Sequence, residues 1–317
     1  MRWAVAVLAA GKGTRLRSDL PKVLHELAGR PLIDHVLDRA LEIAEPRDVV
    51  VVLGHGRDRV AAHLEGTGVV TVVQEPQLGT GDALRVALGG VPPGAGAVVV
   101  LSGDVPLLRS GTLARLVETV DAGASAAVLT AVLEEPGAYG RVIRGPAGSL
   151  DRIVEARDAG PAELAVAEVN AGTYAFRTER LEARLGALVP ENAQGEYYLT
   201  DLIALLRRDG ETVAAVELED PDEMLGVNDR ADLALVASVL NRRVLDALMA
   251  SGVTVIDPAT TRVEPGCTVG RDAVLEPGVV LRRGTTVGPG ARIGAHSVLD
   301  GVAIAAGELV PPLARRP

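Results

Sequence analysis

A six-residue repeat near the end of the chain restricts what this sequence can fold into more than any other feature. Glycine follows this repeat directly at residues 270, 288 and 294, and turn residues fill the remaining intervals. Six residues per side is the repeat of a triangular parallel β-helix. We therefore expect a short left-handed parallel β-helix over residues 251–317. The repeated apolar positions are Val263, Val269, Leu275, Leu281, Val287, Ile293, Leu299 and Ala305.

Residues 1–230 follow a different pattern, in which short apolar runs alternate with segments of helical spacing. Strands buried on both faces that alternate with helices predict a mostly parallel α/β sheet. Ligands of such sheets bind at the carboxyl ends of the strands. The expected strands are Trp3–Leu8, Val49–Leu53, Val69–Val73, Ala97–Leu101 and Ala126–Val132, and the clearest helices are Leu32–Ala44 and Leu113–Val120.

Between these two parts, residues 231–250 have apolar spacing and contain neither glycine nor proline. This pattern predicts one connecting helix. The expected organisation is a first domain over 1–230, the helix over 231–250, and the β-helix over 251–317.

Composition excludes several classes of partner. The net charge is −10 and there is no basic tract, which argues against a nucleic acid or a membrane surface. No apolar stretch approaches the roughly 20 residues of a membrane span. The apolar run before Ala10 meets Gly-Lys-Gly-Thr-Arg, so we expect a strand there and not a signal peptide. Cys267 is the only cysteine, which favours a reducing compartment, and we expect the cytoplasm.

A glycine-rich turn, Ala9–Arg15, follows the first strand. Such a turn holds an anion through its amides and the dipole of the helix behind it. It is neither a Walker P-loop nor a dinucleotide fingerprint, since Leu16 stands where the latter needs glycine. Taken alone, the turn fits a purely structural role equally well.

The positions of the lysines favour an anion-binding role over a purely structural one. Lys12 and Lys22 are the only two lysines beside thirty arginines, and both fall in one short stretch, with Lys12 in this turn and Lys22 flanking it. Most surface lysines tolerate arginine, but a compact ammonium against phosphate oxygens does not. This reasoning is stronger for Lys22, because Lys12 also fits a solvated turn residue. We expect Arg15 and Lys22 to converge on a polyphosphate.

Several longer segments resemble sugar-phosphate nucleotidyltransferases. The likeness is greatest to bacterial N-acetylglucosamine-1-phosphate uridylyltransferases, which form the first half of a bifunctional enzyme, and it spans the α/β part and the hexapeptide tail. It implies a Rossmann-like, mixed or mostly parallel sheet of the nucleotide-diphospho-sugar transferase type. The segments are L-A-A-G-K-G-T-R-L at 8–16, S-D-L-P-K-V-L-H at 18–25, Q-E-P-Q-L-G-T-G at 74–81, S-G-D-V-P-L at 102–107, G-A-Y-G-R-V at 137–142, I-V-E-A-R-D-A at 153–159, E-V-N-A-G at 168–172, N-A-Q-G-E-Y-Y-L-T-D at 192–201 and G-V-N-D-R at 226–230.

The resemblance implies transfer of UMP from UTP to N-acetylglucosamine-1-phosphate with release of pyrophosphate. The nucleophile is already anionic, so catalysis needs in-line positioning and charge neutralisation and no general base. Arg15 and Lys22 would be the catalytic cations. The matched nucleotide-binding residues are Leu8, Ala9, Ala10, Gly11, Arg15 and Lys22 for the triphosphate, and Gln74, Gly79 and Thr80 for the uracil.

Asp104 and Asn228 match the family's magnesium ligands. Mg²⁺ prefers hard oxygens and usually takes only one or two from the protein. Two alternatives stay open: Asp104 as a cap of the next helix, and Asp229 as the ligand in place of Asn228. The remaining matched substrate-binding residues are Ser102, Gly103, Gly140, Glu155 and Asn170, of which the last three would bind the amino sugar.

Two rival functions remain: a nucleotidyltransferase for another sugar-1-phosphate, and a catalytically silent regulatory subunit. Residues 251–317 contain no lysine and one histidine, His296, which fits a loop residue. We therefore expect this segment to lack the relatives' acetyltransferase activity. A short β-helix also favours packing against identical copies, so we expect a homotrimer.

Overall fold

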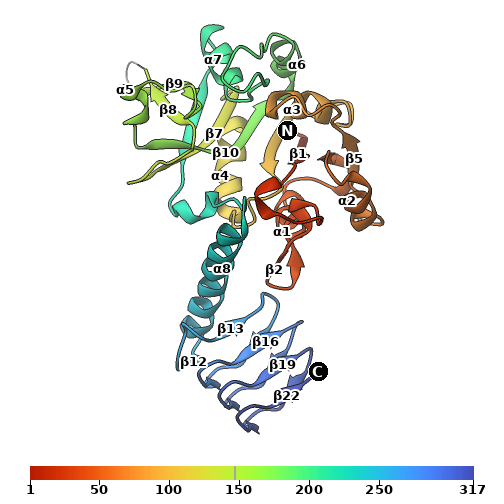
Figure 1. The fold of residues 1–317 in the computed structure, drawn as a ribbon, viewed down its shortest axis with the longest axis vertical. Helices are drawn as coiled ribbons and strands as arrows, with labels where there is room; N and C mark the ends of the chain where they lie inside the picture. Colours follow the sequence, from red (N-terminus) through yellow and green to blue (C-terminus); the bar gives the residue numbers. More distant parts are fainter. Residues whose placement is uncertain (146–147) are drawn as a thin grey trace. The chain divides into compact units, whose positions relative to one another are not determined.

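The structure is a computed structural model that describes residues 1–145 and 148–317 (Figure 1). The chain divides into two compact units. Unit 1 contains residues 1–25 and 31–229, and unit 2 contains residues 26–30 and 230–317. Within the described residues, no helix is both long and apolar enough to cross a bilayer.

Unit 1 is built on one mixed sheet whose main path runs β11-β7-β10-β6-β1-β4-β5. All neighbours on this path are parallel except β10, which runs antiparallel to both β6 and β7. An antiparallel pair, β8 and β9, joins this sheet through β10. The predicted fold, a mixed and mostly parallel sheet, is confirmed. The strands are β1 (Trp3–Ala9), β4 (Val49–Leu53), β5 (Val70–Val73), β6 (Ala97–Ser102), β7 (Ala126–Val132), β8 (Arg141–Arg144), β9 (Leu150–Val154), β10 (Glu168–Arg177) and β11 (Val213–Glu217).

Helices flank this sheet. The α-helices are α1 (Leu32–Ala40), α2 (Arg57–Leu64), α3 (Thr80–Leu88), α4 (Ser110–Asp121), α5 (Pro161–Leu164), α6 (Leu181–Leu185) and α7 (Asp201–Arg208). Short 3₁₀ turns are η1 (Thr14–Leu16), η2 (Lys22–Leu24), η3 (Pro46–Asp48), η5 (Thr178–Arg180) and η6 (Pro221–Met224).

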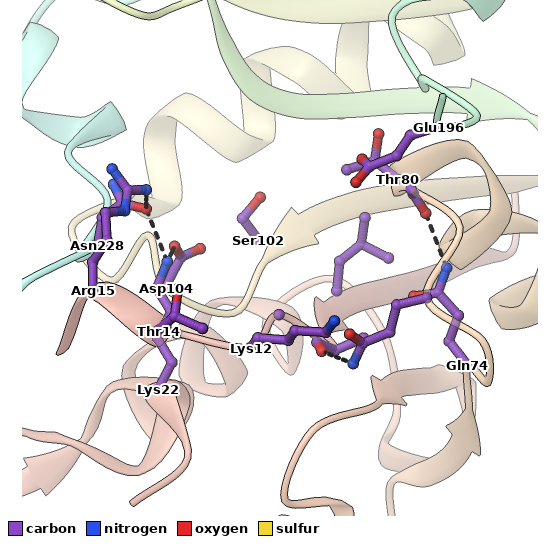
Figure 2. A pocket seen from close by; sticks show the side chains of 16 residues that line it. Lys12, Thr14, Arg15, Lys22, Gln74, Thr80, Ser102, Asp104, Glu196 and Asn228 are labelled. Carbon is purple, nitrogen blue, oxygen red and sulfur yellow. Dashed lines mark hydrogen bonds and ion pairs between the residues drawn. The ribbon is translucent and has the colours of Figure 1, made fainter. Parts of the chain in front are cut away.

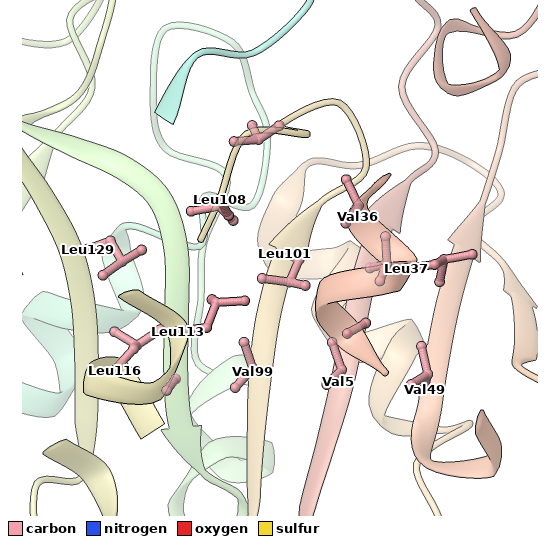
Figure 3. Packing of buried hydrophobic residues seen from close by; sticks show 14 of the residues in the cluster. Val5, Val36, Leu37, Val49, Val99, Leu101, Leu108, Leu113, Leu116 and Leu129 are labelled. Carbon is pink, nitrogen blue, oxygen red and sulfur yellow. The ribbon is translucent and has the colours of Figure 1, made fainter. Parts of the chain in front are cut away.

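Each face of the sheet carries its own apolar core. Val5 packs with α1 and α4 in one core (Figure 3), and its neighbour Ala6 packs with α3 and α7 in the other. Successive side chains of a strand point to opposite faces, so both cores need apolar residues at every position of the central strands. β5 departs from the prediction, because it is an edge strand with Val73 44% exposed.

Helix α1 ends four residues earlier than its apolar spacing predicts. Its last residue is Ala40, and the Ile43 amide donates to the Ala40 carbonyl in a tight turn. Pro46 follows shortly afterwards, and the residue before a proline disfavours helical geometry.

The longer segment of unit 2 begins with α8 (Arg230–Ala250) and continues as short parallel strands that stack into three sheets. This arrangement is the predicted parallel β-helix of hexapeptide coils. The strands are β12 (Thr254–Val255), β13 (Arg262–Val263), β14 (Thr268–Val269), β15 (Val274–Leu275), β16 (Val280–Arg282), β17 (Thr286–Val287), β18 (Arg292–Ile293), β19 (Val298–Asp300), β20 (Ala303–Ile304), β21 (Leu309–Val310) and β22 (Arg315–Arg316), while β2 (Glu26–Leu27) and β3 (Arg30–Pro31) form a separate hairpin.

The repeat slips once, at its last step. Leu281 pairs with Leu299, eighteen positions later, but Val287 pairs with Ile304, only seventeen positions later. Ile304 is therefore buried in the β-helix core and Ala305, which the six-residue period places there, is exposed. The turn between β19 and β20 is one residue short, and the pairing register absorbs the difference.

A buried asparagine ties α8 to the first coil. Asn241 is 8% exposed; its Nδ2 donates to Thr261 O at 3.0 Å, and its Oδ1 accepts from Val263 N at 3.0 Å. One side chain thereby satisfies two backbone groups that no strand pairs, which is why a polar residue is tolerated there.

Candidate active site

A cavity of about 490 Å³ opens in unit 1 where β1 and β6 end and where η1, η2 and α3 begin (Figure 2). This is the carboxyl edge of the parallel strands, where ligands of such sheets bind. The cavity is lined by Leu8, Ala10, Gly11, Lys12, Gly13, Thr14, Arg15, Lys22, Gln74, Gln77, Gly79, Thr80, Ser102, Asp104, Glu196 and Asn228. Most residues that the sequence places in the nucleotide and metal sites therefore line one cavity.

Lys22 is at the centre of the charged side of this cavity. Its Nζ donates to Asn228 Oδ1 at 3.0 Å and forms an ion pair with Asp104. Arg15 Nη2 donates to the same Asn228 oxygen at 2.9 Å. Two cations and two oxygen ligands therefore meet at one point, although they come from three distant parts of the chain.

The glycine-rich turn packs directly on Lys22. Gly13 has φ +61°, and a Cβ added there would lie 2.8 Å from Lys22 Cβ. A glycine is needed for both reasons, since other residues rarely adopt this φ and a side chain would collide with Lys22. The turn thereby sets where the Lys22 ammonium lies.

The opposite side of the cavity carries the residues predicted to bind the uracil. Gln74 follows the edge strand β5 and is 4% exposed. Its Nε2 donates to Gly79 O at 3.0 Å, and Thr80 is the first residue of α3. Gly79 has φ +108°, and an added Cβ would lie 2.7 Å from Tyr197 O. Only glycine fits this turn.

Three predicted sugar-binding residues lie together but do not line the cavity. The Asn170 amide donates to Gly140 O at 2.9 Å, and a Cβ on Gly140 would lie 3.5 Å from the Glu155 carboxylate. Gly172 lies close to the cavity lining, because an added Cβ there would lie 3.9 Å from Ser102 Oγ. β10 is irregular between Asn170 and Tyr174, next to this point.

Glu155 has an unusual electrostatic environment within this group. Burial raises the pKa of its carboxyl, a hydrogen bond from Thr200 Oγ1 at 3.0 Å opposes that rise, and Asp201 and Asp158 add to it. A raised pKa caused by burial is frequent in binding sites, where a ligand supplies the missing partner.

Two predicted residues lie behind the cavity wall. Ala9 is 5% exposed, and the Gly103 amide donates to Leu8 O at 2.9 Å. Close packing between them explains the glycine, because a Cβ on Gly103 would lie 3.2 Å from Ala9 Cβ. These residues shape the cavity and do not line it.

The cavity also contains residues to which sequence reasoning assigned no role. Gln77 Nε2 donates to Ala10 O at 2.6 Å and so ties the turn to the segment after β5. Gln77 stands inside the matched segment at 74–81, which was the available signal. The other such lining residues are Gly13, Thr14 and Glu196, together with Lys12, which the sequence left open as a solvated turn residue.

The donor set suits a divalent cation. Asp104 and Asn228 present a carboxylate and an amide oxygen to one shared cation, the Lys22 ammonium. Within residues 1–145 and 148–317, no three His, Cys, Asp or Glu side chains gather into a complete metal cage. Two hard oxygens with space for water and phosphate are what Mg²⁺ usually accepts from a protein.

Two family descriptions match the chain. "MobA-like NTP transferase domain" matches residues 5–271, and "Bacterial transferase hexapeptide (six repeats)" matches residues 266–301. The chain belongs to the MobA-like NTP transferase family. The predicted resemblance to nucleotidyltransferases is therefore confirmed, and membership in this NTP transferase family implies a requirement for a divalent metal.

Several relatives of this NTP transferase carry the name "Bifunctional protein GlmU". The one from Mycobacterium marinum is 46% identical over 309 residues, which cover 95% of this chain and 63% of the relative. That from Mycolicibacterium vanbaalenii is 46% identical over 97% of this chain and 64% of its own length. The Latilactobacillus sakei protein is 44% identical, with 92% and 63% covered. The chain thus spans less than two thirds of the length of these relatives.

A solved structure shows the same fold. A putative glucose-1-phosphate thymidylyltransferase from Bacillus anthracis, in complex with a sucrose, superposes with a TM-score of 0.59. The superposition covers 75% of this NTP transferase and 94% of that chain at 20% identity. At this identity the likeness supports the fold and not a shared substrate.

Proposed function

We propose that this NTP transferase transfers UMP from UTP to N-acetylglucosamine-1-phosphate, giving UDP-N-acetylglucosamine and pyrophosphate. The observation that carries the proposal is the meeting of Lys22 and Arg15 with Asn228 and Asp104 beside the glycine-rich turn. The ordered segments that resemble uridylyltransferases support the choice of sugar, and the relatives named GlmU are consistent with it.

In this reaction an oxygen of the sugar phosphate attacks the α-phosphorus of UTP. The new P–O bond forms as the bond between the α-phosphorus and its oxygen bridge to the β-phosphorus breaks. Pyrophosphate leaves with that electron pair. No proton has to be removed from the nucleophile, so the chain's task is to align the reactants and neutralise charge. Lys22 and Arg15 perform the second task at the phosphates.

Asp104 and Asn228 would hold Mg²⁺, with Lys22 then free to contact phosphate oxygens. When bound, the ion supplies neutralisation of the phosphate charge. Gly140, Glu155 and Asn170 would receive the amino sugar, and the turn residues Leu8 to Gly11 would hold the triphosphate. These assignments are our proposal for the site.

Pyrophosphate release tests this function. The assay pairs UTP, dTTP, CTP and GTP with a panel of sugar-1-phosphates, in the presence and absence of Mg²⁺. We expect UTP with N-acetylglucosamine-1-phosphate to give the highest kcat/KM. A preference for another sugar-1-phosphate would assign the chain to the first rival function. No turnover with any pair would support a regulatory subunit.

We further propose that the chain forms a homotrimer through its β-helix. Three flat sheets of short parallel strands suit packing around a threefold axis. Ile256 on this unit is 54% exposed, which identical copies would cover. Light scattering at micromolar concentration is the test, and a monomer there would contradict the proposal.

Absence of acetyl transfer by residues 251–317 stays a prediction, as does cytoplasmic localisation.

A further inference from the structure

A buried carboxylate holds the proposed uracil-binding glutamine from behind. Asp82 is the third residue of α3 and is 4% exposed. Its Oδ2 accepts from Gln74 Nε2 at 2.8 Å, and its other oxygen forms an ion pair with Arg85, one helical turn later. Both residues of the Gln74–Asp82 hydrogen bond are almost fully buried.

This contact determines the orientation of the Gln74 side-chain amide, that is, the positions of its Oε1 and Nε2 atoms. A glutamine amide can usually be turned over, since its oxygen and nitrogen have nearly the same shape. Here both neighbours of Nε2 are obligate acceptors: a carboxylate of Asp82 and the carbonyl of Gly79, at 2.8 and 3.0 Å. An inverted amide would place Oε1 against two oxygens, so only one orientation is chemically acceptable.

Gly79, the second acceptor, is itself held in place. Its turn packs on the Tyr197 backbone, and the Gly81 amide donates to Tyr197 O at 2.8 Å. The Tyr197 amide donates in turn to Leu78 O at 2.8 Å. The Gly79 carbonyl is therefore held in place against a turned-over Gln74.

We propose that Asp82, held by Arg85, is a positioning residue that fixes Gln74 with Oε1 as a hydrogen-bond acceptor, so that the site selects nucleotides whose base presents an N–H donor there. Uracil has such a donor at N3, whereas cytosine has an acceptor at the same atom. The proposal rests on the proposed function, in which Gln74 reads the base. It adds the expectation that the site discriminates against CTP, together with the structural reason.

The competing explanation is that Asp82 only stabilises the start of α3. Acidic residues in a first turn do so through the helix dipole. However, the two oxygens of the Asp82 carboxylate accept from the side chains of Gln74 and Arg85. The two explanations differ in one measurable quantity, the ratio of UTP to CTP affinity.

The test measures pyrophosphate release and direct calorimetric binding with UTP and CTP for the wild type and Asp82→Asn. An asparagine offers an N–H as well as an oxygen, so only the Gly79 carbonyl would then oppose the inverted orientation of Gln74. We expect wild type to favour UTP over CTP by about a hundredfold or more. In Asp82→Asn this ratio should fall about tenfold, through a higher KM for UTP at nearly unchanged kcat.

Two further variants make the result decisive. Arg85→Gln removes a mostly exposed partner of Asp82 and should lower the ratio about two- to fivefold; it decides the question if Asp82→Asn does not fold. Asp246→Asn is the control, because Asp246 also pairs with an arginine on a helix, Arg242, but in unit 2. It should leave the ratio unchanged.

An unchanged UTP to CTP ratio in Arg85→Gln and Asp82→Asn would overturn the proposal, as would an equal loss with both nucleotides. Failure of the wild type to turn over UTP with any sugar-1-phosphate would instead overturn the proposed function. The calorimetric ratio separates these two failures, since it needs no turnover.

Discussion

Lys22 Nζ and Asn228 Oδ1 lie 3.0 Å apart although 206 positions separate them in the chain. Asp104 contacts the same ammonium, so Lys22 sits among oxygens contributed by two later segments of unit 1. Its side chain is only 14% exposed, which leaves little room for a larger cation. The first two predictions follow from this arrangement.

Lys22→Arg should be nearly as damaging as Lys22→Ala. A planar guanidinium cannot occupy the position of the ammonium between Asp104 and Asn228 without displacing one of them. We expect kcat to fall by about 10²- to 10³-fold in both variants. Lys12→Arg is the matched control, because Lys12 is exposed in the adjacent glycine-rich turn and should tolerate arginine far better. Full activity of Lys22→Arg would contradict the argument from ammonium size.

Asp104→Ala should lower kcat by about three orders of magnitude and weaken UTP binding only moderately. In the proposed function the carboxylate would hold Mg²⁺ at the reacting phosphates and would not contact the base. Single-turnover kinetics across a Mg²⁺ titration, beside calorimetric UTP binding, separates the two effects. Asp58→Ala is the control, since that side chain is 99% exposed. A near-normal rate would remove Asp104 from the reaction.

Gly13→Ala should reduce activity beyond its effect on folding. Both Gly13 and Gly66 have positive φ, but an added Cβ collides with Lys22 only at Gly13, while nothing lies within 4 Å at Gly66. We expect Gly66→Ala to lose about 1 kcal/mol of stability, and Gly13→Ala to lose more because its Cβ also collides with Lys22 Cβ. Only Gly13→Ala should lower kcat/KM, by about tenfold or more, because it displaces the ammonium. Chemical denaturation and steady-state kinetics on both variants check this.

Glu155→Gln should stabilise the fold at neutral pH. Burial raises the pKa of the Glu155 carboxyl, so the folded chain favours its neutral form. Stability is then highest below the ordinary pKa of a glutamate, near 4, and falls as the pH rises through the higher folded value. Glutamine stays neutral, so its Tm should exceed that of the wild type at pH 7 and match it near pH 3.

Glu163→Gln should change the thermal stability at pH 7 in the opposite direction. The Gly160 amide and Arg152 lower the pKa of Glu163, so its contribution is present above the ordinary pKa and is lost as the pH falls. Glu163→Gln should therefore lower Tm slightly at pH 7. The same sign in both variants would contradict the electrostatic explanation.

We also expect Glu155→Gln to raise KM for the sugar phosphate about tenfold if Glu155 binds it.

Asn241→Ala should destabilise unit 2 by about 1–3 kcal/mol. The substitution removes the hydrogen bond to the buried Val263 amide and one of the two bonds to the Thr261 carbonyl, which also accepts from Arg262 Nη1 at 3.1 Å. Arg242→Ala is the neighbouring control, since its ion pair with Asp246 is exposed and should contribute less than about 1 kcal/mol. Thermal unfolding followed by circular dichroism distinguishes the two, and an equal effect would refute the bonding role of Asn241.

The sequence by itself determined the local elements and the chemistry of the turn. Alternating apolar runs specify β1, β4, β6 and β7, because a strand buried on both faces needs an apolar residue at every position. The six-residue period specifies the β-helix, because every coil repeats the same three sides. The only two lysines of the chain, which the sequence singles out, both line the cavity of unit 1.

Only the tertiary structure decided which distant residues meet. The antiparallel insertion of β10, the contacts of Lys22 with Asp104 and Asn228, and the Asp82 support of Gln74 depend on sheet order and on side-chain directions. The burial of Ile304 in place of Ala305 depends on the pairing register, which one short turn shifts by one residue. Local periodicity reports which face of an element is buried, and it holds no information on which other element covers that face.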